Sequence, residues 1–170
     1  MPARPVVEIP NPVLKRIAEP CGGADAALAQ DLLDTMAVSP GCVGLAAPQI
    51  GVSRRAFVLD VSNHPKVTDS HGLVVLFDPE VLLSEGSKVA REGCMSVPHF
   101  TANVRRAERV VVRGTGRGGE ERYYEAEGFE ARAFQHELDH LGGMLILDRV
   151  ASLRTDVFGR KTYQPPPRRE

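Results

Sequence analysis

Two histidines four residues apart are the most chemically suggestive feature of this sequence. His136 and His140 belong to the segment Gln-His-Glu-Leu-Asp-His, and on a helix residues four apart lie on the same face. Both imidazoles can therefore bind one metal ion. Glu137 follows the first histidine and can serve as a general acid and base on a water that the ion activates. An exposed, charged helix face that contains two histidines by chance is the less favoured interpretation.

A catalytic metal site generally has three protein ligands, and no third ligand stands out after His140. Residues 141–170 contain no histidine. Upstream, Cys94 follows Gly93, which lets a backbone approach a site closely, and precedes Pro98, which stiffens the exit. A thiolate at this position would complete a Cys-His-His set, although a cysteine taken alone is more often an inert buried thiol.

A third segment, residues 41–51, is rich in small residues and contains one side-chain amide, that of Gln49. On one interpretation it is a tight loop packed against a strand, and Gln49 is merely solvated. On the other, a ligand backbone lies along the loop and the Gln49 amide donates to a developing oxyanion. Phosphate binding is disfavoured because the segment matches neither GxxxxGK[ST] nor GxGxxG.

Taken together and in this order, the three segments resemble the peptide deformylase family. The family signatures GxGxAAxQ, EGCxS and QHExDH correspond to residues 42–49, 92–96 and 135–140. Residues 9–14 and 145–149 also look like the family, so the resemblance covers about residues 6–150.

The resemblance implies a metal-dependent hydrolase. One divalent ion would be bound by Cys94, His136 and His140, with water in the fourth position. The ion would be Fe²⁺, with Zn²⁺, Ni²⁺ or Co²⁺ as common replacements. The reaction would be the hydrolytic removal of the N-formyl group from the N-terminal methionine of newly synthesised polypeptides.

The resemblance also assigns catalytic and substrate-binding residues. Glu137 would take a proton from the water and later deliver one to the departing amine. Gln49 and the backbone N–H of Met95 would stabilise the oxyanion. The peptide would lie antiparallel to the loop near Val43 and Gly44. The methionine pocket would draw on Val43, Glu92, Phe129, Ala133 and His136. Phe129 and Ala133 could equally be ordinary helix residues packed against the sheets, and both descriptions can hold at once.

Two positions depart from the family pattern. Cys42 stands where the first signature has a glycine, and it would be strained if the backbone there required a positive φ. Residues 99–102 lack the arginine that many relatives carry there to hold the substrate backbone. Arg106 matches a more structural arginine, which we expect to pair with an acid near the metal helix.

The elements that must position these residues indicate an α+β fold, with mostly antiparallel sheets packed around a central metal-binding helix. One helix is expected to begin after the N-cap residue Asp25 and to end before Ser39. A second is expected over residues 129–141, ending at a pair of glycines. The expected strands are residues 55–61, 73–77, 81–83, 109–113 and 122–127, with a hairpin loop at 114–119.

Composition limits the remaining possibilities. The 170 residues fit one domain, with a proline-rich tail at about 164–170 that is expected to be mobile. A net charge of −1 provides no general attraction for nucleic acid or membranes. Three cysteines cannot form a complete disulfide framework, which favours the reducing cytoplasm. His64, His71 and His99 are expected in surface loops, facing solvent and away from the metal.

The expected partners are N-formylmethionyl peptides and nascent chains, without a membrane or a specific nucleic acid. Some relatives contact the ribosome through a long basic C-terminal helix, which the tail of this chain does not resemble. Two other functions remain open. The His-Glu-x-x-His segment taken alone would also fit a zinc endopeptidase, but this chain offers no third ligand downstream of it. A deformylase-like module could bind peptides without turnover, although the full catalytic set argues against it.

Overall fold

The computed structural model describes residues 3–160, and these form an α+β fold. The α-helices are α1 (Ala26–Ala37) and α2 (Gly128–Leu141), and the short 3₁₀ helices are η1 (Pro12–Lys15), η2 (Ala47–Ile50) and η3 (Ile146–Asp148). The strands are β1 (Gly44–Ala46), β2 (Ala56–Leu59), β3 (Val74–Glu85), β4 (Lys88–Cys94), β5 (Val97–Arg106), β6 (Arg109–Thr115), β7 (Glu121–Glu127) and β8 (Val157–Gly159). The proline-rich tail expected at about 164–170 lies outside the described residues.

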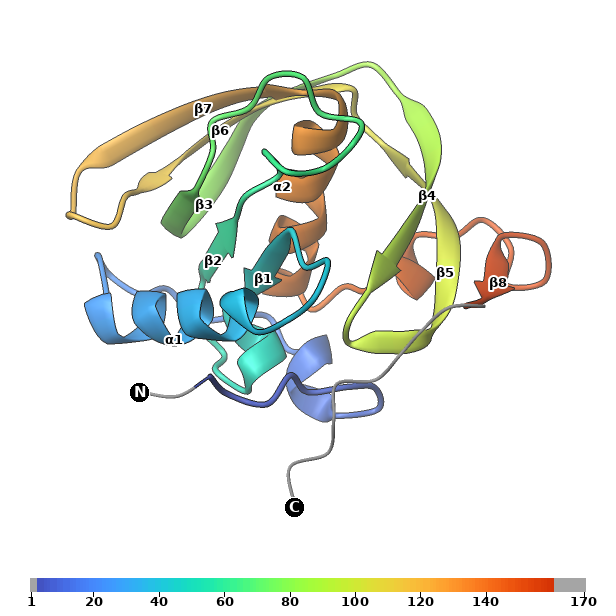
Figure 1. Ribbon diagram of the computed structural model, residues 1–170, viewed down its shortest axis with the longest axis horizontal. Helices are drawn as coiled ribbons and strands as arrows, with labels where there is room; N and C mark the ends of the chain where they lie inside the picture. The colour runs from blue at the N-terminus through green and yellow to red at the C-terminus, as the bar shows by residue number, and fades with distance from the viewer. Residues whose placement is uncertain (1–2, 161–170) are drawn as a thin grey trace.

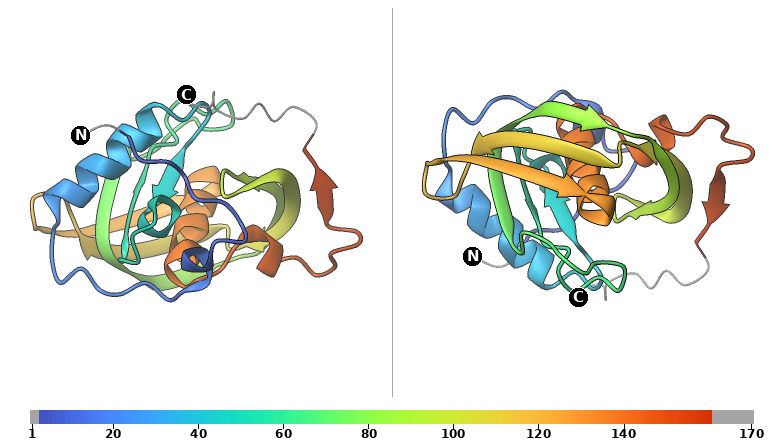
Figure 2. Two further views of the ribbon diagram at one scale, coloured as in Figure 1. Left: turned by 90° about the horizontal axis from the view of Figure 1, so that it is seen from below. Right: turned by 90° about the horizontal axis from the view of Figure 1, so that it is seen from above.

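The strands form two sheets, and every pairing between these strands is antiparallel. The larger sheet has the order β1-β2-β3-β6-β7, and the smaller has the order β4-β5-β8. Helix α2 stands between the larger sheet and the β4–β5 hairpin, whereas α1 lies on the outer side of the larger sheet (Figure 1, Figure 2). The expected α+β class with antiparallel sheets around a central helix is confirmed.

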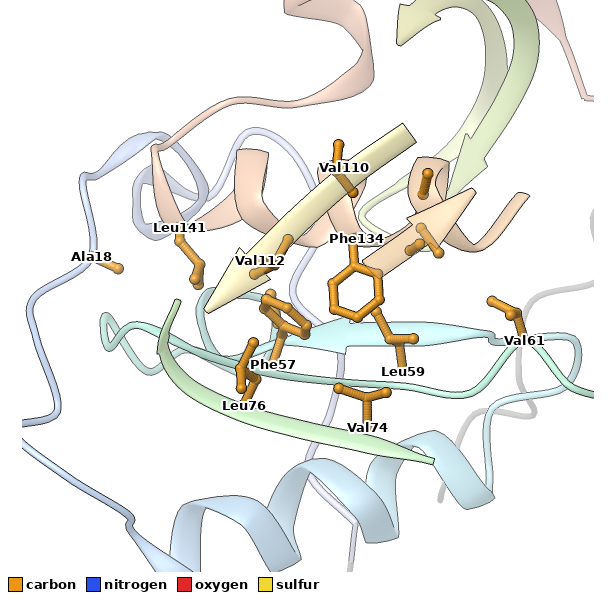
Figure 3. Close-up of a cluster of buried hydrophobic side chains, with 14 residues drawn as sticks. Ala18, Phe57, Leu59, Val61, Val74, Leu76, Val110, Val112, Phe134 and Leu141 are labelled. Atoms are coloured by element: carbon orange, nitrogen blue, oxygen red, sulfur yellow. The ribbon is translucent and has the colours of Figure 1, made fainter. Parts of the chain in front are cut away.

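Strand β2 is buried on both faces and packs against α2 on one of them. Its four residues are all buried because helices cover both faces of the sheet. Phe57 and Leu59 point toward α2, and the Phe57 ring meets that of Phe134 edge to face at 5.9 Å (Figure 3). Ala56 and Val58 point to the opposite face and pack in the cluster that includes residues of α1. The period-two alternation of a strand thus divides the core into two layers, and α2 is anchored in one of them.

The helices begin and end close to the expected residues. The Asp25 side chain accepts a hydrogen bond from the Leu28 N–H at 3.0 Å, which makes it the predicted N-cap of α1. Helix α2 ends at the glycine pair, with Gly142 as its C-cap. Within residues 3–160, no helix has the length and apolarity that crossing a bilayer would need.

The predicted strands at 73–77 and 81–83 are wrong as separate elements, because both belong to β3. A bulge between Phe77 and Glu80 joins them. There Asp78 adopts a φ of 50°, and its carboxylate accepts the backbone N–H groups of Cys21 and Gly22 at 2.7 and 2.9 Å. The bulge therefore accommodates the Asp-Pro pair that looks like a strand break in the sequence.

Candidate metal centre

Three residues from two elements converge between the sheets. Cys94 is the last residue of β4, and His136 and His140 lie one turn apart on α2. One candidate ligand atom from each lies within 4.8 Å of the other two. The Cys94 sulfur is 3.4 Å from Nε2 of His140. The structure therefore brings together the three residues that the sequence nominated as metal ligands.

The chemistry of this cluster suits a divalent transition metal. Burial opposes ionisation of Cys94, but His140 and His136 outweigh it and lower the pKa of the thiol well below its ordinary value. A thiolate and two imidazoles form a donor set suited to iron, zinc or related ions. Within the described residues, two buried side-chain polar atoms lack a hydrogen-bond partner, Oε2 of Glu137 and Nδ1 of His140. Buried polar atoms are normally satisfied, so the unpartnered Oε2 of Glu137 fits a site that holds a water or metal ion. Nδ1 of His140 carries no such argument, because it is Nε2 of that ring that faces the Cys94 sulfur.

Charged side chains orient the first histidine. Nδ1 of His136 lies 3.0 Å from a carboxylate oxygen of Glu92, so its Nε2 remains for the cluster. Glu92 also accepts hydrogen bonds from Arg106 at 2.9 and 3.0 Å and from Arg132 at 2.8 Å. Burial would raise the pKa of Glu92, but His136 and Arg106 lower it to about 2. Arg106 also reaches Asp139 on α2 at 2.5 Å, the expected pairing with an acid near the metal helix.

Glu137 faces the cluster from α2 and packs against strand β1. Glu137 is 4% exposed, and burial raises the pKa of its carboxyl group to about 6 against the lowering effect of the two histidines. A Cβ atom placed on Gly44 would lie 2.8 Å from Oε1 and 3.1 Å from Cδ of Glu137. Only glycine lets the β1 backbone come this close to the carboxylate.

Gln49 is fixed by hydrogen bonds at the edge of the same cluster. Its Oε1 accepts the Ala46 N–H at 3.0 Å, and its Nε2 donates to Oγ of Ser96 at 3.1 Å and toward the Cys94 sulfur at 3.5 Å. Backbone N–H groups of the N-terminal segment donate to the carbonyls of Gln49 and Ser96 at 2.8 and 2.9 Å. The solvated alternative for Gln49 is therefore wrong, because the residue is 2% exposed.

A cleft of about 810 Å³ opens beside the cluster. All residues that the sequence nominated for catalysis or substrate binding line it: Val43, Gly44, Gln49, Glu92, Met95, Phe129, Ala133, His136 and Glu137. Cys94 also lines the cleft, whereas His140 is buried behind it. Glu92 lines the cleft with its carboxylate already engaged by two arginines and His136.

The polar loop at residues 62–72 forms part of this cleft, which the sequence did not indicate. The His64 ring stacks on that of Phe129, with centroids 3.9 Å apart and an angle of 13°. His71 donates its backbone N–H to Glu130 at 2.9 Å, and its ring lies 2.6 Å from the same carboxylate. His64 lies in the expected loop but is half-buried, because its ring stacks on Phe129 in the first turn of α2. A polar loop has no periodic pattern that could reveal such contacts.

Cys42 carries none of the strain that its position suggested. Among the described residues, Asp78 is the only non-glycine residue with a positive φ. The Cys42 thiol donates to the Gly44 carbonyl at 3.1 Å. Burial, and secondarily the negative charge of Glu137, raise its pKa to about 12. The thiol therefore stays protonated beside the cleft and is a poor nucleophile.

Comparison with known proteins decides the family. The sequence profile of the polypeptide deformylase family matches residues 3–156. The chain belongs to the peptide deformylase family, a family of enzymes.

Individual relatives match this chain over nearly its whole length. A peptide deformylase from Halothermothrix orenii is 43% identical over 161 residues, which cover 93% of this chain and 100% of that protein. The crystal structure of the peptide deformylase from Thermotoga maritima matches with a TM-score of 0.80 at 38% identity, covering 89% and 100% of the two chains. A Met-Ala-Ser-bound class I type b peptide deformylase from Acinetobacter baumannii matches with a TM-score of 0.79 at 34% identity, covering 87% and 98%.

Proposed function

We propose that this deformylase removes the N-formyl group from the N-terminal methionine of newly synthesised polypeptides by metal-dependent hydrolysis. The observation that carries the proposal is the buried carboxylate of Glu137, whose unpartnered oxygen lies beside the cysteine–histidine cluster in the cleft wall. Cys94, His136 and His140 would hold one divalent ion, with Fe²⁺ favoured and Zn²⁺, Ni²⁺ or Co²⁺ as alternatives. When bound, the ion would supply Lewis acidity toward water and the formyl oxygen.

The protein side chains would handle the proton and the developing charge. Glu137 would accept a proton from the attacking water and deliver one to the amine nitrogen. A C–O bond to the formyl carbon forms and the C–N bond breaks, so the products are formate and a free N-terminal amine. Gln49, through Nε2, and the backbone N–H of Met95 would donate to the oxyanion. Because Gln49 is already held through its Oε1, it would need little rearrangement to do so.

The cleft would receive the start of an extended peptide. It runs between β1 and β4, which are edge strands of their sheets, so both offer backbone groups to a peptide. Val43, Phe129 and Ala133 would contact the methionine side chain. The Met-Ala-Ser peptide bound to the A. baumannii relative supports a substrate of this kind. Nascent chains would be the natural substrates, which places the reaction in the cytoplasm; we propose no ribosome contact through the tail.

Release of formate tests this function directly. The protein would be loaded anaerobically with Fe²⁺, Ni²⁺ or Zn²⁺ and incubated with formyl-Met-Ala-Ser, because a thiolate-ligated iron site is sensitive to oxygen. Acetyl-Met-Ala-Ser and Met-Ala-Ser would serve as matched controls. We expect metal-dependent formate release from the formyl peptide alone.

Two other outcomes would replace the proposal. Cleavage of an internal bond in the unformylated peptide would identify an endopeptidase. Binding of the formyl peptide by fully metallated protein without formate release would identify a peptide-binding module.

A further inference from the structure

Strand β8 brings one more cation to the cleft. It pairs with β5, with Thr101 opposite Phe158, and the Arg160 N–H continues the pairing by donating to the His99 carbonyl at 2.9 Å. Phe158 and Arg160 are two residues apart and so project from the same face. The Phe158 ring lies under the Arg91 guanidinium, 3.7 Å from Cζ to centroid. In Figure 2, β8 lies along the outer side of β5.

The Arg160 side chain crosses β5 and reaches the strand that carries Cys94. Its guanidinium lies against Gly93, and a Cβ atom on Gly93 would overlap it. The same Cβ position lies 3.6 Å from the Thr101 methyl group, so a side chain at position 93 would displace the guanidinium. Gly93 and Arg160 line the cleft together, next to the candidate metal ligand Cys94.

Charge and geometry indicate what this guanidinium could bind. A guanidinium only donates hydrogen bonds, so its ligand must provide oxygen acceptors. The formyl carbon must reach the cluster at Cys94 and Glu137, and the remainder of a peptide must then leave along the cleft. Arg160 is half-buried at the side of that path, beside Gly93 of β4.

We propose that Arg160 is a substrate-positioning residue, whose guanidinium binds an oxygen of the peptide beyond its formylmethionine residue. The proposal rests on the deformylase function proposed above. The acceptor is a main-chain carbonyl or, in a short peptide, the C-terminal carboxylate. Arg160 would thus hold the peptide against β4 while the formyl group lies at the cluster.

Separate measurement of KM and kcat tests the role. Arg160→Ala, Arg160→Lys and the control Arg154→Ala, an exposed residue of the segment before β8, would be assayed with formyl-Met-Ala-Ser as free acid and as C-terminal amide. We expect Arg160→Ala to raise KM about tenfold or more, as for a lost charge-assisted hydrogen bond, with kcat changed by less than about twofold. Arg160→Lys should recover part of the loss, and Arg154→Ala should match the parent protein.

The two peptide forms identify the acceptor. An increase in KM confined to the free acid indicates the carboxylate, and an equal increase for acid and amide indicates a carbonyl. An unchanged KM in Arg160→Ala, or a loss confined to kcat, would overturn the assignment. If Arg160→Ala lowers the thermal midpoint, Arg160→Gln replaces it because it retains most of the side-chain stem.

Failure of the proposed function itself would be visible separately. If the parent protein, fully loaded with metal, releases no formate, that function is wrong whatever Arg160 does. Calorimetric titration with formyl-Met-Ala-Ser then compares the Kd of the parent and Arg160→Ala proteins. A weaker Kd in the variant supports peptide positioning by Arg160, and an equal Kd rejects it.

Discussion

The candidate general base Glu137 packs directly against the β1 backbone at Gly44. The carboxylate is buried beside two histidines and a cysteine, and the β1 backbone closes over it because Gly44 has no side chain. A carboxylate fixed in this way can transfer a proton without first reorganising. Substitutions at Glu137 and at Gly44 should therefore reduce activity for different reasons.

Replacing Glu137 with glutamine should separate metal binding from turnover. Glutamine has nearly the same shape but cannot accept the proton, so we expect kcat/KM to fall about 10²–10⁴-fold, the usual contribution of a general base. Metal content should stay at the parent level, since Glu137 is not one of the proposed ligands. Formate release and metal analysis check both statements, with the exposed Glu121→Gln as control. A glutamine variant that turns over normally would remove Glu137 from the mechanism.

Gly44→Ala should displace the same carboxylate while leaving its chemistry intact. The added Cβ would meet Oε1 of Glu137 at 2.8 Å, so the side chain must move. A displacement of about 1 Å can cost about 100-fold in rate, and we expect kcat to fall by at least about tenfold. Gly159→Ala is the matched control, because a Cβ there would meet no atom within 4 Å. Full activity in Gly44→Ala would show that the close contact is not needed.

At the scale of elements, a buried ionic network joins β4 to α2. Glu92 of β4 and Asp139 of α2 both bind Arg106, which is 5% exposed on β5. Glu92 in turn orients His136. The network therefore sets the distance between the strand that carries Cys94 and the helix that carries both histidines.

Arg106→Met should destabilise the fold as well as the site. It would leave the Glu92 and Asp139 carboxylates buried without this counter-charge, and breaking a buried pair in this way typically costs about 3–5 kcal/mol. Chemical denaturation would measure the loss in the free energy of unfolding. Arg109→Met is the control, because its partners Glu85 and Glu125 are exposed, and exposed ion pairs contribute little. Equal stability of the two variants would contradict the structural role assigned to Arg106.

At the scale of the whole molecule, the candidate centre lies where separate parts of the fold meet. The smaller sheet contributes the thiolate of Cys94, and α2, which is anchored in the core of the larger sheet, contributes both imidazoles. An ion bound by all three would connect these parts in the folded state only. Binding should thus stabilise the entire chain.

Removing the ion should lower the melting temperature. At a free ion concentration about 100 times Kd, binding contributes about 2.7 kcal/mol, which corresponds to about 5–10 °C for a chain of this size. Calorimetric scans of stripped and reloaded protein would measure the shift. The shift should persist in Glu137→Gln and shrink in Cys94→Ser, which replaces a soft ligand by a harder one. A Cys94→Ser protein with an unchanged shift would exclude Cys94 as a ligand.

The sequence by itself determined the features that depend on local order. Helical spacing placed His136 and His140 on one face, Asp25 was identifiable as a cap, and the glycine pair as the end of α2. These features are fixed by backbone geometry within one or two turns. The motifs also indicated the family correctly, because each is a short run of neighbouring residues.

Only the tertiary structure decided which distant residues meet. The β4–β5 hairpin was not predicted, because β4 is mostly exposed and the buried positions of β5 alternate only in its second half, where one of them is the charged Arg106. The stacking of His64 on Phe129, the placement of Arg160 beside Gly93 and the absence of strain at Cys42 likewise depend on long-range packing. Such contacts follow from how sheets and helices close around a shared core, and no local pattern of residue types records that closure.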